Sequence, residues 1–399
     1  MTVRAGREFL SIPGPTTVPD EVLSAMHRPA VDIYSGPLVA MTASLLDDLH
    51  LLFRTRGRTY IYAANGHGAW EAALTNVLSR GDKVLVLDSG RFATGWGEMA
   101  RGLGADVEVL AGDYTRAVRP GEVEARLRVD KLHAIKAILV VQIDTASGVV
   151  NDIAAIARAV RAAGHPALLM VDVVASLACM PFEMDDWGVD VAVAGSQKGL
   201  MTPPGLSFVA AGERAVAAHK NAGLVTPYWD WSFREGEEHY QKYCGTPPEH
   251  LLFALRKAID LLKAEGLERV FERHRLLAEA THRAVAVWSQ GGVLSFSVRN
   301  PEERAPSVTT VLWQPPDGSN HSLQAFVGYA RERCGVVLGT GIGALDGKAF
   351  RIAHMGHSNA PMVLGTLSVV EMALAALGIP HGSGGAQAAI KHLAETVRP

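Results

Sequence analysis

Lys198 is the residue whose position most directly suggests chemistry. It follows an apolar, alternating run at residues 189–194 and stands in residues 195–199 (GSQKG), with proline and glycine at 203–205. The run predicts a buried strand. A lysine at the exit of such a strand is costly to bury unless its charge is paired or its neutral amine is bonded. A Schiff base with a carbonyl cofactor meets that requirement.

Asp172 is the carboxylate that we expect closest to this lysine. It ends residues 167–172 (ALLMVD) and precedes Lys198 by the span of one helix-and-strand unit. The carboxyl ends of parallel strands meet at one edge of a sheet, where ligands bind. A carboxylate there can hold the protonated pyridine nitrogen of pyridoxal phosphate while the lysine binds its aldehyde. The alternative is that Asp172 caps a helix and Lys198 lies on the surface; spacing alone leaves both open.

Three turns between predicted strands and helices carry further candidate ligands. Gly66 and His67 precede a helix, and backbone amides at a helix N-terminus bind phosphate, although an ordinary tight turn has the same pattern. We expect His67 to contribute its backbone rather than act as a base. Phe92 is placed either to stack on a planar cofactor ring or to join the core. The hydroxyl of Thr145 either reaches a phenolic oxygen of the cofactor or forms an ordinary turn.

The second half of the chain adds a hydroxyl-rich turn and an arginine. Tyr243 and Thr246, in residues 243–248 (YCGTPP), either cap the next helix or bind a phosphate. Arg351 alternates with apolar residues in 350–353 (FRIA), which predicts a strand. A buried arginine needs an anionic partner. A substrate carboxylate and a salt bridge between domains satisfy that need equally well.

Composition narrows the class of protein. The 399 residues include 38 basic and 41 acidic side chains, so no net field favours nucleic acid or an anionic membrane surface. No apolar run reaches the length of a membrane span, and the N-terminus lacks a signal peptide. The sparse, odd set of cysteines favours a reducing compartment, and no histidine or cysteine spacing predicts a metal site. We therefore expect a cytoplasmic protein that binds small molecules.

Strands and helices alternate over the first 250 residues. Apolar or β-branched runs occur at 58–63, 83–87, 106–110, 136–142, 167–172, 189–194 and 206–210. The intervening helical patterns predict an α/β fold with a mostly parallel, seven-stranded sheet. The last two strands are too close for a helical crossover, so one of them is expected to run antiparallel. We predict an N-terminal arm (1–20), a large domain (21–265) and a smaller α+β domain (266–399).

These segments, in this order, resemble the class V aminotransferases of fold type I, and most closely the serine–glyoxylate and alanine–glyoxylate group. The resemblance spans about residues 10–385, and the block around Lys198 with its downstream Pro-Gly is its most specific part. The other matching segments are 13–15 (PGP), 66–72 (GHGAWEA), 172–176 (DVVAS), 246–247 (TP) and 351–356 (RIAHMG). The resemblance implies fold type I and pyridoxal phosphate as cofactor.

The resemblance also implies roles for the residues at the cofactor ring. Lys198 would hold pyridoxal phosphate as the internal aldimine and then move the proton. Asp172 would pair with the pyridine nitrogen, Phe92 would stack on the ring and Thr145 would contact the ring hydroxyl. Arg351 would bind the α-carboxylate of the substrate.

Phosphate binding is implied to involve two subunits. Gly66, His67 and Gln197 would bind the phosphate within one chain. Tyr243 and Thr246 would complete that site from the neighbouring subunit. The implied oligomer is therefore a homodimer with shared active sites.

Two segments depart from the serine–glyoxylate pattern. Residues 33–36 (IYSG) replace a His-Arg pair, which makes Tyr34 the expected substrate contact there. Ile143 and Asp144 replace an Asn-Glu pair. Both segments face the substrate pocket in that group, so the amino donor and acceptor stay open. Pyridoxamine–pyruvate aminotransferases, in which pyridoxamine is a substrate, share the scaffold, but Ile342 stands where they carry an arginine.

The sequence thus predicts transamination between a small amino acid, such as serine or alanine, and glyoxylate or pyruvate. A lyase or desulfurase on the same scaffold is the alternative chemistry. A desulfurase needs a cysteine on a mobile loop, and Cys334, at a predicted helix end, is the only candidate in the second domain.

Overall fold

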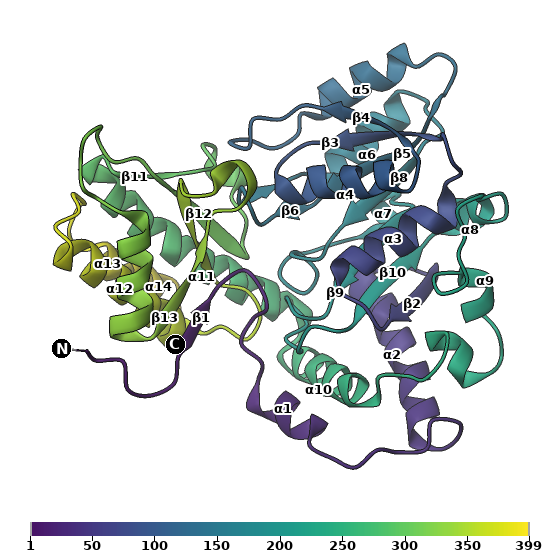
Figure 1. Cartoon of the computed structure of the whole chain (residues 1–399), viewed down its shortest axis with the longest axis horizontal. Helices are drawn as coiled ribbons and strands as arrows, with labels where there is room; N and C mark the ends of the chain where they lie inside the picture. Colours follow the sequence, from purple (N-terminus) through teal and green to yellow (C-terminus); the bar gives the residue numbers. More distant parts are fainter. Residues whose placement is uncertain (1, 398–399) are drawn as a thin grey trace.

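A seven-stranded sheet forms the centre of the larger part of the protein in the computed structural model, which describes residues 2–397 (Figure 1). The first residue of the expected arm and the last two of the expected C-terminal domain lie outside the described residues. In spatial order, the strands are β2 (Arg58–Tyr62), β10 (Ser207–Ala211), β9 (Val191–Gly195), β8 (Leu168–Asp172), β5 (Ile135–Val141), β3 (Lys83–Leu87) and β4 (Asp106–Leu110).

The sheet is parallel except at β10. This strand pairs antiparallel with both β9 and β2, because the short connection after β9 leaves no room for a helical crossover. The predicted seven-stranded, mostly parallel sheet and its antiparallel strand are confirmed. β8 and β9 are parallel neighbours, so the ends of both strands lie at the same sheet edge.

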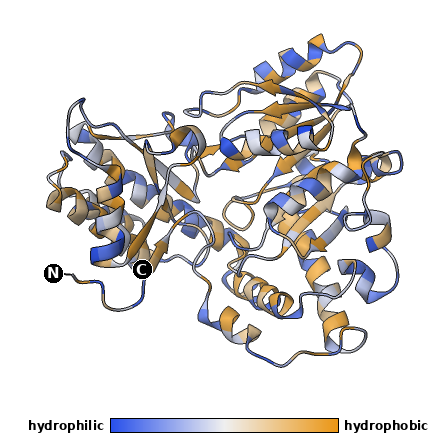
Figure 2. Cartoon of the chain, in the orientation of Figure 1, coloured by the Kyte–Doolittle hydropathy of each residue, from blue (hydrophilic) through white to orange (hydrophobic). Residues whose placement is uncertain are grey.

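Helices cover both faces of this sheet. Successive residues of β5 alternate between two apolar clusters, with Val140 in one and Leu139 in the other. Figure 2 shows the strands as largely hydrophobic, as expected for a sheet buried on both faces. The helices of this part are α1 (Asp20–Met26), α2 (Pro37–Phe53), α3 (Gly66–Val77), α4 (Arg91–Gly102), α5 (Pro120–Val129), α6 (Ile153–Ala162), α7 (Met184–Trp187), α8 (Glu213–His219), α9 (Trp231–Arg234), α10 (Glu249–Glu265) and the 3₁₀ helix η1 (His239–Tyr243).

A second, five-stranded sheet lies beside the first (Figure 1). Its strands, in spatial order, are β1 (Phe9–Ser11), β13 (Val336–Thr340), β14 (Ala349–Ala353), β12 (Val308–Trp313) and β11 (Leu294–Phe296). The expected extended arm therefore contributes a strand, β1, which pairs parallel to β13. The helices of this part are α11 (Leu267–Trp288), α12 (Leu323–Cys334), α13 (Ala360–Ala376) and α14 (Gly385–Thr396), with the 3₁₀ turns η2 (Ser289–Gly291), η3 (Pro301–Glu303) and η4 (Gly343–Leu345).

Two features connect the parts. α10 and α11 meet at Gly266, whose φ of 88° is accessible mainly to glycine. A small hairpin, β6 (Ile143–Asp144) and β7 (Val149–Val150), follows β5 and reaches the second sheet, where the hydroxyl of Thr310 on β12 donates to the carbonyl of Ala146. Within residues 2–397, no helix combines the length and the apolar character that a membrane crossing requires. The predicted domain boundaries stay a prediction.

Candidate active site

A cavity of about 230 Å³ lies at the carboxyl ends of β8 and β9. Seven of the residues singled out from the sequence line it, although they come from segments up to 132 positions apart. They are Gly66, His67, Phe92, Thr145, Asp172, Gln197 and Lys198. The remaining lining residues are Asn65, Trp70, Val141, Ile143, Val174 and Ala175. The sheet therefore brings the predicted lysine, carboxylate, aromatic ring and amides to one place.

Lys198 lies in the turn after β9, beneath the N-terminal arm. Its Nζ donates a hydrogen bond to the carbonyl of Pro13, and the hydroxyl of Thr16 donates to the carbonyl of Lys198 at 3.1 Å. A Cβ on Gly14 would lie 2.5 Å from Nζ, so glycine permits the arm to approach this closely. Burial lowers the pKa of Lys198 to about 8, and the positive charge of Arg351 acts in the same direction. A lysine of this pKa has a substantial neutral, nucleophilic fraction near neutral pH.

Asp172 is the last residue of β8 and is buried. Its Oδ1 accepts from the backbone amide of Val174, and its Oδ2 accepts from Nε1 of Trp70, both at 2.7 Å. Burial raises the pKa of this carboxyl to about 7. A cation beside it would favour the ionised form, and a protonated pyridine nitrogen is such a cation.

Trp70 is a site residue that the sequence analysis did not single out. It lies one turn into α3 from Gly66 and fixes Asp172 through its indole N–H. Its ring packs against Phe92 and stacks on Trp96. Its spacing from Gly66 could have indicated that Trp70 belongs to the site, because residues four apart on a helix share a face.

The N-terminus of α3 is the expected phosphate end of the cavity. Asn65, another residue not singled out, accepts from the amides of His67 at 3.1 Å and Gly68 at 3.3 Å and so caps the helix. Burial and the nearby Arg91 lower the pKa of His67, which is therefore neutral near pH 7. Oε1 of Gln197 is buried with no hydrogen-bond partner among the described residues. This orphaned amide group is suited to a polar ligand.

Arg351 is buried on the strand β14 and contacts the turn of the β6–β7 hairpin. Its Nε donates to the carbonyl of Thr340 at 2.8 Å, and its Nη1 donates to the carbonyl of Thr145 at 3.0 Å. No ion pair involves Arg351 within the part of the chain that the structure describes, so the alternative of a salt bridge between domains is not observed. Burial lowers its pKa to about 10. Arg351 does not line the cavity itself, but its partner Thr145 does.

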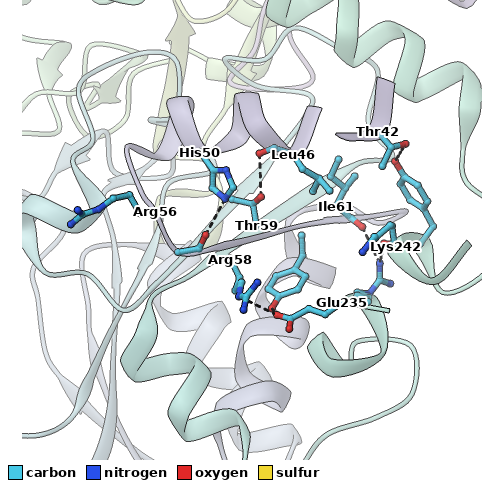
Figure 3. Close-up of a pocket in the computed structure, with 13 residues that line it drawn as sticks. Thr42, Leu46, His50, Arg56, Arg58, Thr59, Ile61, Glu235 and Lys242 are labelled. Carbon is cyan, nitrogen blue, oxygen red and sulfur yellow. Dashed lines mark hydrogen bonds and ion pairs between the residues drawn. The ribbon is translucent and has the colours of Figure 1, made fainter. Parts of the chain in front are cut away.

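Three predicted residues lie away from the cavity. Tyr34 is 73% exposed, and Thr246 is exposed too. Tyr243 is buried, with its hydroxyl 2.8 Å from that of Thr42. It borders a different cavity, of about 370 Å³, beside β2 and α2 (Figure 3). One chain alone therefore does not bring these three side chains to Lys198.

The donor set fits pyridoxal phosphate. A lysine amine, a buried carboxylate, an aromatic ring and an amide side chain with an unpaired oxygen surround one cavity. None of the cysteines lines it, and burial raises the pKa of the Cys179 thiol to about 12, so that thiol stays protonated. Across residues 2–397, no cluster of histidine, cysteine or acidic side chains has an arrangement suited to a metal ion.

Comparison with known proteins agrees with this geometry. The family model described as Aminotransferase class-V matches residues 52–330. The chain is 40% identical to serine–glyoxylate aminotransferase of Methylorubrum extorquens, over 99% of this chain and 98% of that protein. It is 38% identical to L-aspartate–glyoxylate aminotransferase of Paracoccus denitrificans, over 96% of each chain.

A solved structure supports the same assignment. The crystal structure of pyridoxamine–pyruvate aminotransferase from Mesorhizobium loti superposes with a TM-score of 0.90, at 28% identity and over 100% of both chains. The fold type I architecture expected from the sequence is thus confirmed. On the family match and on these identities, the chain belongs to the class V aminotransferases.

Proposed function

We propose that this aminotransferase moves the amino group of a small amino acid, such as serine, alanine or aspartate, to glyoxylate or pyruvate. Its cofactor is pyridoxal phosphate. The observation that carries the proposal is Arg351, a buried cation that forms no ion pair among the described residues, although the charge of Asp144 acts on it, and that is bonded to the rim of the cavity that holds Lys198. A small substrate carboxylate satisfies that cation. The names of the relatives support the choice of donor and acceptor.

Each residue at the cavity has a proposed task. When bound, pyridoxal phosphate supplies an aldehyde that takes up the amino group and a ring that withdraws electrons. Lys198 holds the aldehyde through Nζ and then moves the proton at the substrate's α-carbon. Asp172 keeps the pyridine nitrogen protonated. Phe92 packs on the ring, and Thr145 contacts its hydroxyl.

The phosphate site is proposed to form at the start of α3. The Gly66 and His67 backbone and the Gln197 side chain, which lines the cavity, provide polar groups there; Gln197 would donate to the phosphate through its Nε2–H group. Gln197→Leu should weaken cofactor binding by about tenfold, because the ligand loses a hydrogen bond in a buried site. The measurement is the dissociation constant of pyridoxal phosphate from titration of the cofactor-free protein.

Half-reactions test the choice of substrate directly. The enzyme is mixed with one amino acid at a time, and loss of the visible band of the lysine-bound cofactor is followed. Serine, alanine or aspartate should convert the cofactor to its pyridoxamine form, and glyoxylate or pyruvate should restore the band. An enzyme that responds to none of these amino acids contradicts the proposed function.

Arg351→Gln should raise KM for the amino acid by about 30-fold or more with a smaller change in kcat. Loss of one partner of a buried charge pair costs about 2–5 kcal/mol. Arg351→Lys should recover only part of the lost affinity for the amino acid, since lysine cannot bind a carboxylate bidentately. Arg304→Gln is the matched control: Arg304 lies over the ring of Phe296 in the same region and bonds only backbone carbonyls. Equal KM values for the Arg351 and Arg304 variants would refute the carboxylate role.

Two other reactions on this scaffold, pyridoxamine–pyruvate transamination and cysteine desulfuration, can be distinguished from the proposed function by particular residues. Pyridoxamine–pyruvate transamination is supported by the fold similarity to the Mesorhizobium loti enzyme. Against it, Ile342 lies where that subgroup is expected to carry an arginine. A desulfurase requires a reactive cysteine. Cys334 ends α12, and burial raises the pKa of its thiol, which disfavours the reactive thiolate. Turnover of free pyridoxamine, or sulfide release from cysteine, would select these alternatives.

We also propose that the chain acts as a homodimer with shared active sites. Thr246 and Tyr34 are exposed and do not line the chain's own cavity, as expected for residues that serve a second subunit. We assign Tyr34 to the substrate site, and Tyr243 and Thr246 to the phosphate site, of that subunit. Residues 21–265 and 266–399 are proposed as the two domains of each subunit, with the boundary at Gly266. The cytoplasm stays the predicted location.

Mixed dimers test site sharing. Lys198→Ala and Thr246→Val subunits should each be weakly active alone. In a mixed dimer, the site with an intact Lys198 receives an intact Thr246 from the other chain. Mixing should therefore restore about a quarter of wild-type kcat, because about half the dimers are mixed and each has one complete site. If no activity returns while chromatography shows mixed dimers, Thr246 does not serve the partner's site.

A further inference from the structure

Asp144 is a buried carboxylate to which the proposed function assigns no task. It lies on β6, between two residues that line the cavity, Ile143 and Thr145, but does not line the cavity itself. The side chain is fully buried and makes no ion pair within residues 2–397. Burial lowers the pKa of Arg351 and the charge of Asp144 acts to raise it, so the two groups attract each other without forming an ion pair. A buried carboxylate that makes no ion pair is held by hydrogen bonds.

Those hydrogen bonds all come from backbone amides. Oδ2 accepts from Phe92 at 2.8 Å and from Ala93 at 3.1 Å, and Oδ1 accepts from Ala146 at 3.0 Å. Phe92 and Ala93 lie in the first turn of α4, whose N-cap, Gly90, has no side chain to bond the free amides. Asp144, on the strand β6, therefore acts as the side-chain cap that the N-terminus of α4 lacks. Its negative charge is also favourable at the positive end of the helix dipole.

The turn before α4 is shaped to admit this carboxylate. A Cβ on Gly90 would overlap the carboxyl group of Asp144, so only glycine leaves room for it. A second bond ties the two segments, because the hydroxyl of Ser147 donates to the carbonyl of Ser89 at 2.7 Å. The start of α4, and with it the ring of Phe92, is thus set by the β6–β7 hairpin.

The same hairpin also holds the arginine of the second sheet. The carbonyl of Thr145, next to Asp144, accepts from Nη1 of Arg351 at 3.0 Å. The carbonyl of Ala146 accepts from the hydroxyl of Thr310 at 3.3 Å. One short segment therefore fixes both a ring that lines the cavity and a guanidinium on the second sheet.

We propose that Asp144 is a positioning residue that places the ring of Phe92 against the cofactor and, through Thr145, places the guanidinium of Arg351 for the substrate carboxylate. The role of Asp144 towards Arg351 rests on the proposed function, because that function makes Arg351 the ligand of the substrate carboxylate. The role of Asp144 towards Phe92 concerns cofactor binding.

Asp144→Asn is the informative variant. An asparagine of the same size presents one acceptor and one donor, so at least one backbone amide would face an N–H group and lose its bond. The dissociation constant of pyridoxal phosphate should rise by about tenfold, as for one unpaired buried amide. The visible circular dichroism of the bound cofactor should weaken, and KM for the amino acid should rise by a similar factor.

Asp152→Asn is the matched control. Asp152 is also a helix-capping aspartate, but it is exposed and is itself the N-cap of α6, where its side chain accepts from the amide of Ala155 at 2.8 Å; it does not line the cavity. It should leave the cofactor dissociation constant, the dichroism and KM at wild-type values. Asp144→Ala is the more severe variant, and Asp144→Asn keeps the test valid if the alanine variant does not fold.

A double variant distinguishes an effect of Asp144 on the position of the Phe92 ring from a general weakening of cofactor binding. In a Phe92→Leu background, Asp144→Asn should add little to the cofactor dissociation constant, because the ring that it positions is already absent. A full additive effect there, or wild-type cofactor binding and dichroism in Asp144→Asn alone, would overturn the proposal. Failure of every amino acid to react with the wild-type enzyme would instead contradict the proposed function, and the cofactor measurements would still decide the role of Asp144.

Discussion

Lys198→Ala should lower kcat by about 10²–10⁴-fold, which is the contribution of a positioned acid–base group. The variant should also lose the visible band of the lysine-bound cofactor, because no other lysine lines the cavity among the described residues. The pKa of about 8 supports this role, since the amine both gives and takes a proton near neutral pH. Stopped-flow half-reactions and absorption spectra measure the two effects separately.

Lys83→Ala is the control for this prediction. Lys83 begins β3, at the opposite end of the strands, and pairs on the surface with Asp106 at 3.3 Å. Its loss should leave the spectrum and kcat unchanged, because exposed ion pairs contribute little. A Lys198→Ala enzyme that keeps both the wild-type spectrum and wild-type kcat would show that another group holds the cofactor.

Asp172→Asn should lower kcat by about 10²–10³-fold, the usual effect of removing one preorganised electrostatic contact. The neutral amide cannot hold the pyridine nitrogen in its protonated form, so the ring withdraws electrons less strongly. The amide can still accept one hydrogen bond, from Trp70 or Val174, so the fold should persist. Asp190→Asn is the control, since Asp190 is a buried carboxylate that bonds the amide of Leu169 and does not line the cavity.

The same variant has a signature in stability. The pKa of Asp172 is raised from 3.8 to about 7, so the folded cofactor-free protein holds a proton that the unfolded chain has released. This contribution is fully present below about pH 4 and is lost as pH rises through 7. Between about pH 4 and 7, the wild-type free energy of unfolding should therefore fall relative to that of Asp172→Asn. Parallel pH profiles of the two cofactor-free proteins, from urea unfolding, would contradict the raised pKa.

The local sequence pattern was sufficient to predict the strands and helices of the large sheet and the residues at the ends of its strands. Apolar or β-branched runs defined the seven strands, because the inner strands of the sheet are buried on both faces. The short link between β9 and β10 implied the antiparallel strand by chain length alone. Asp172 and Lys198 could be paired in advance because parallel neighbours place their carboxyl ends at one edge.

What the sequence by itself determined was the chemistry: a lysine, a carboxylate and an arginine on a scaffold whose periodicity specifies their order. Only the tertiary structure decided their contacts. Trp70 on Asp172, Pro13 on Lys198 and Asp144 on the start of α4 each join segments separated by at least 51 positions. No local spacing encodes such a pair, because its geometry depends on how the sheets, arm and hairpin pack together. The contact of Arg351 with Thr145 belongs to the same class, since it forms only where the β6–β7 hairpin meets β14.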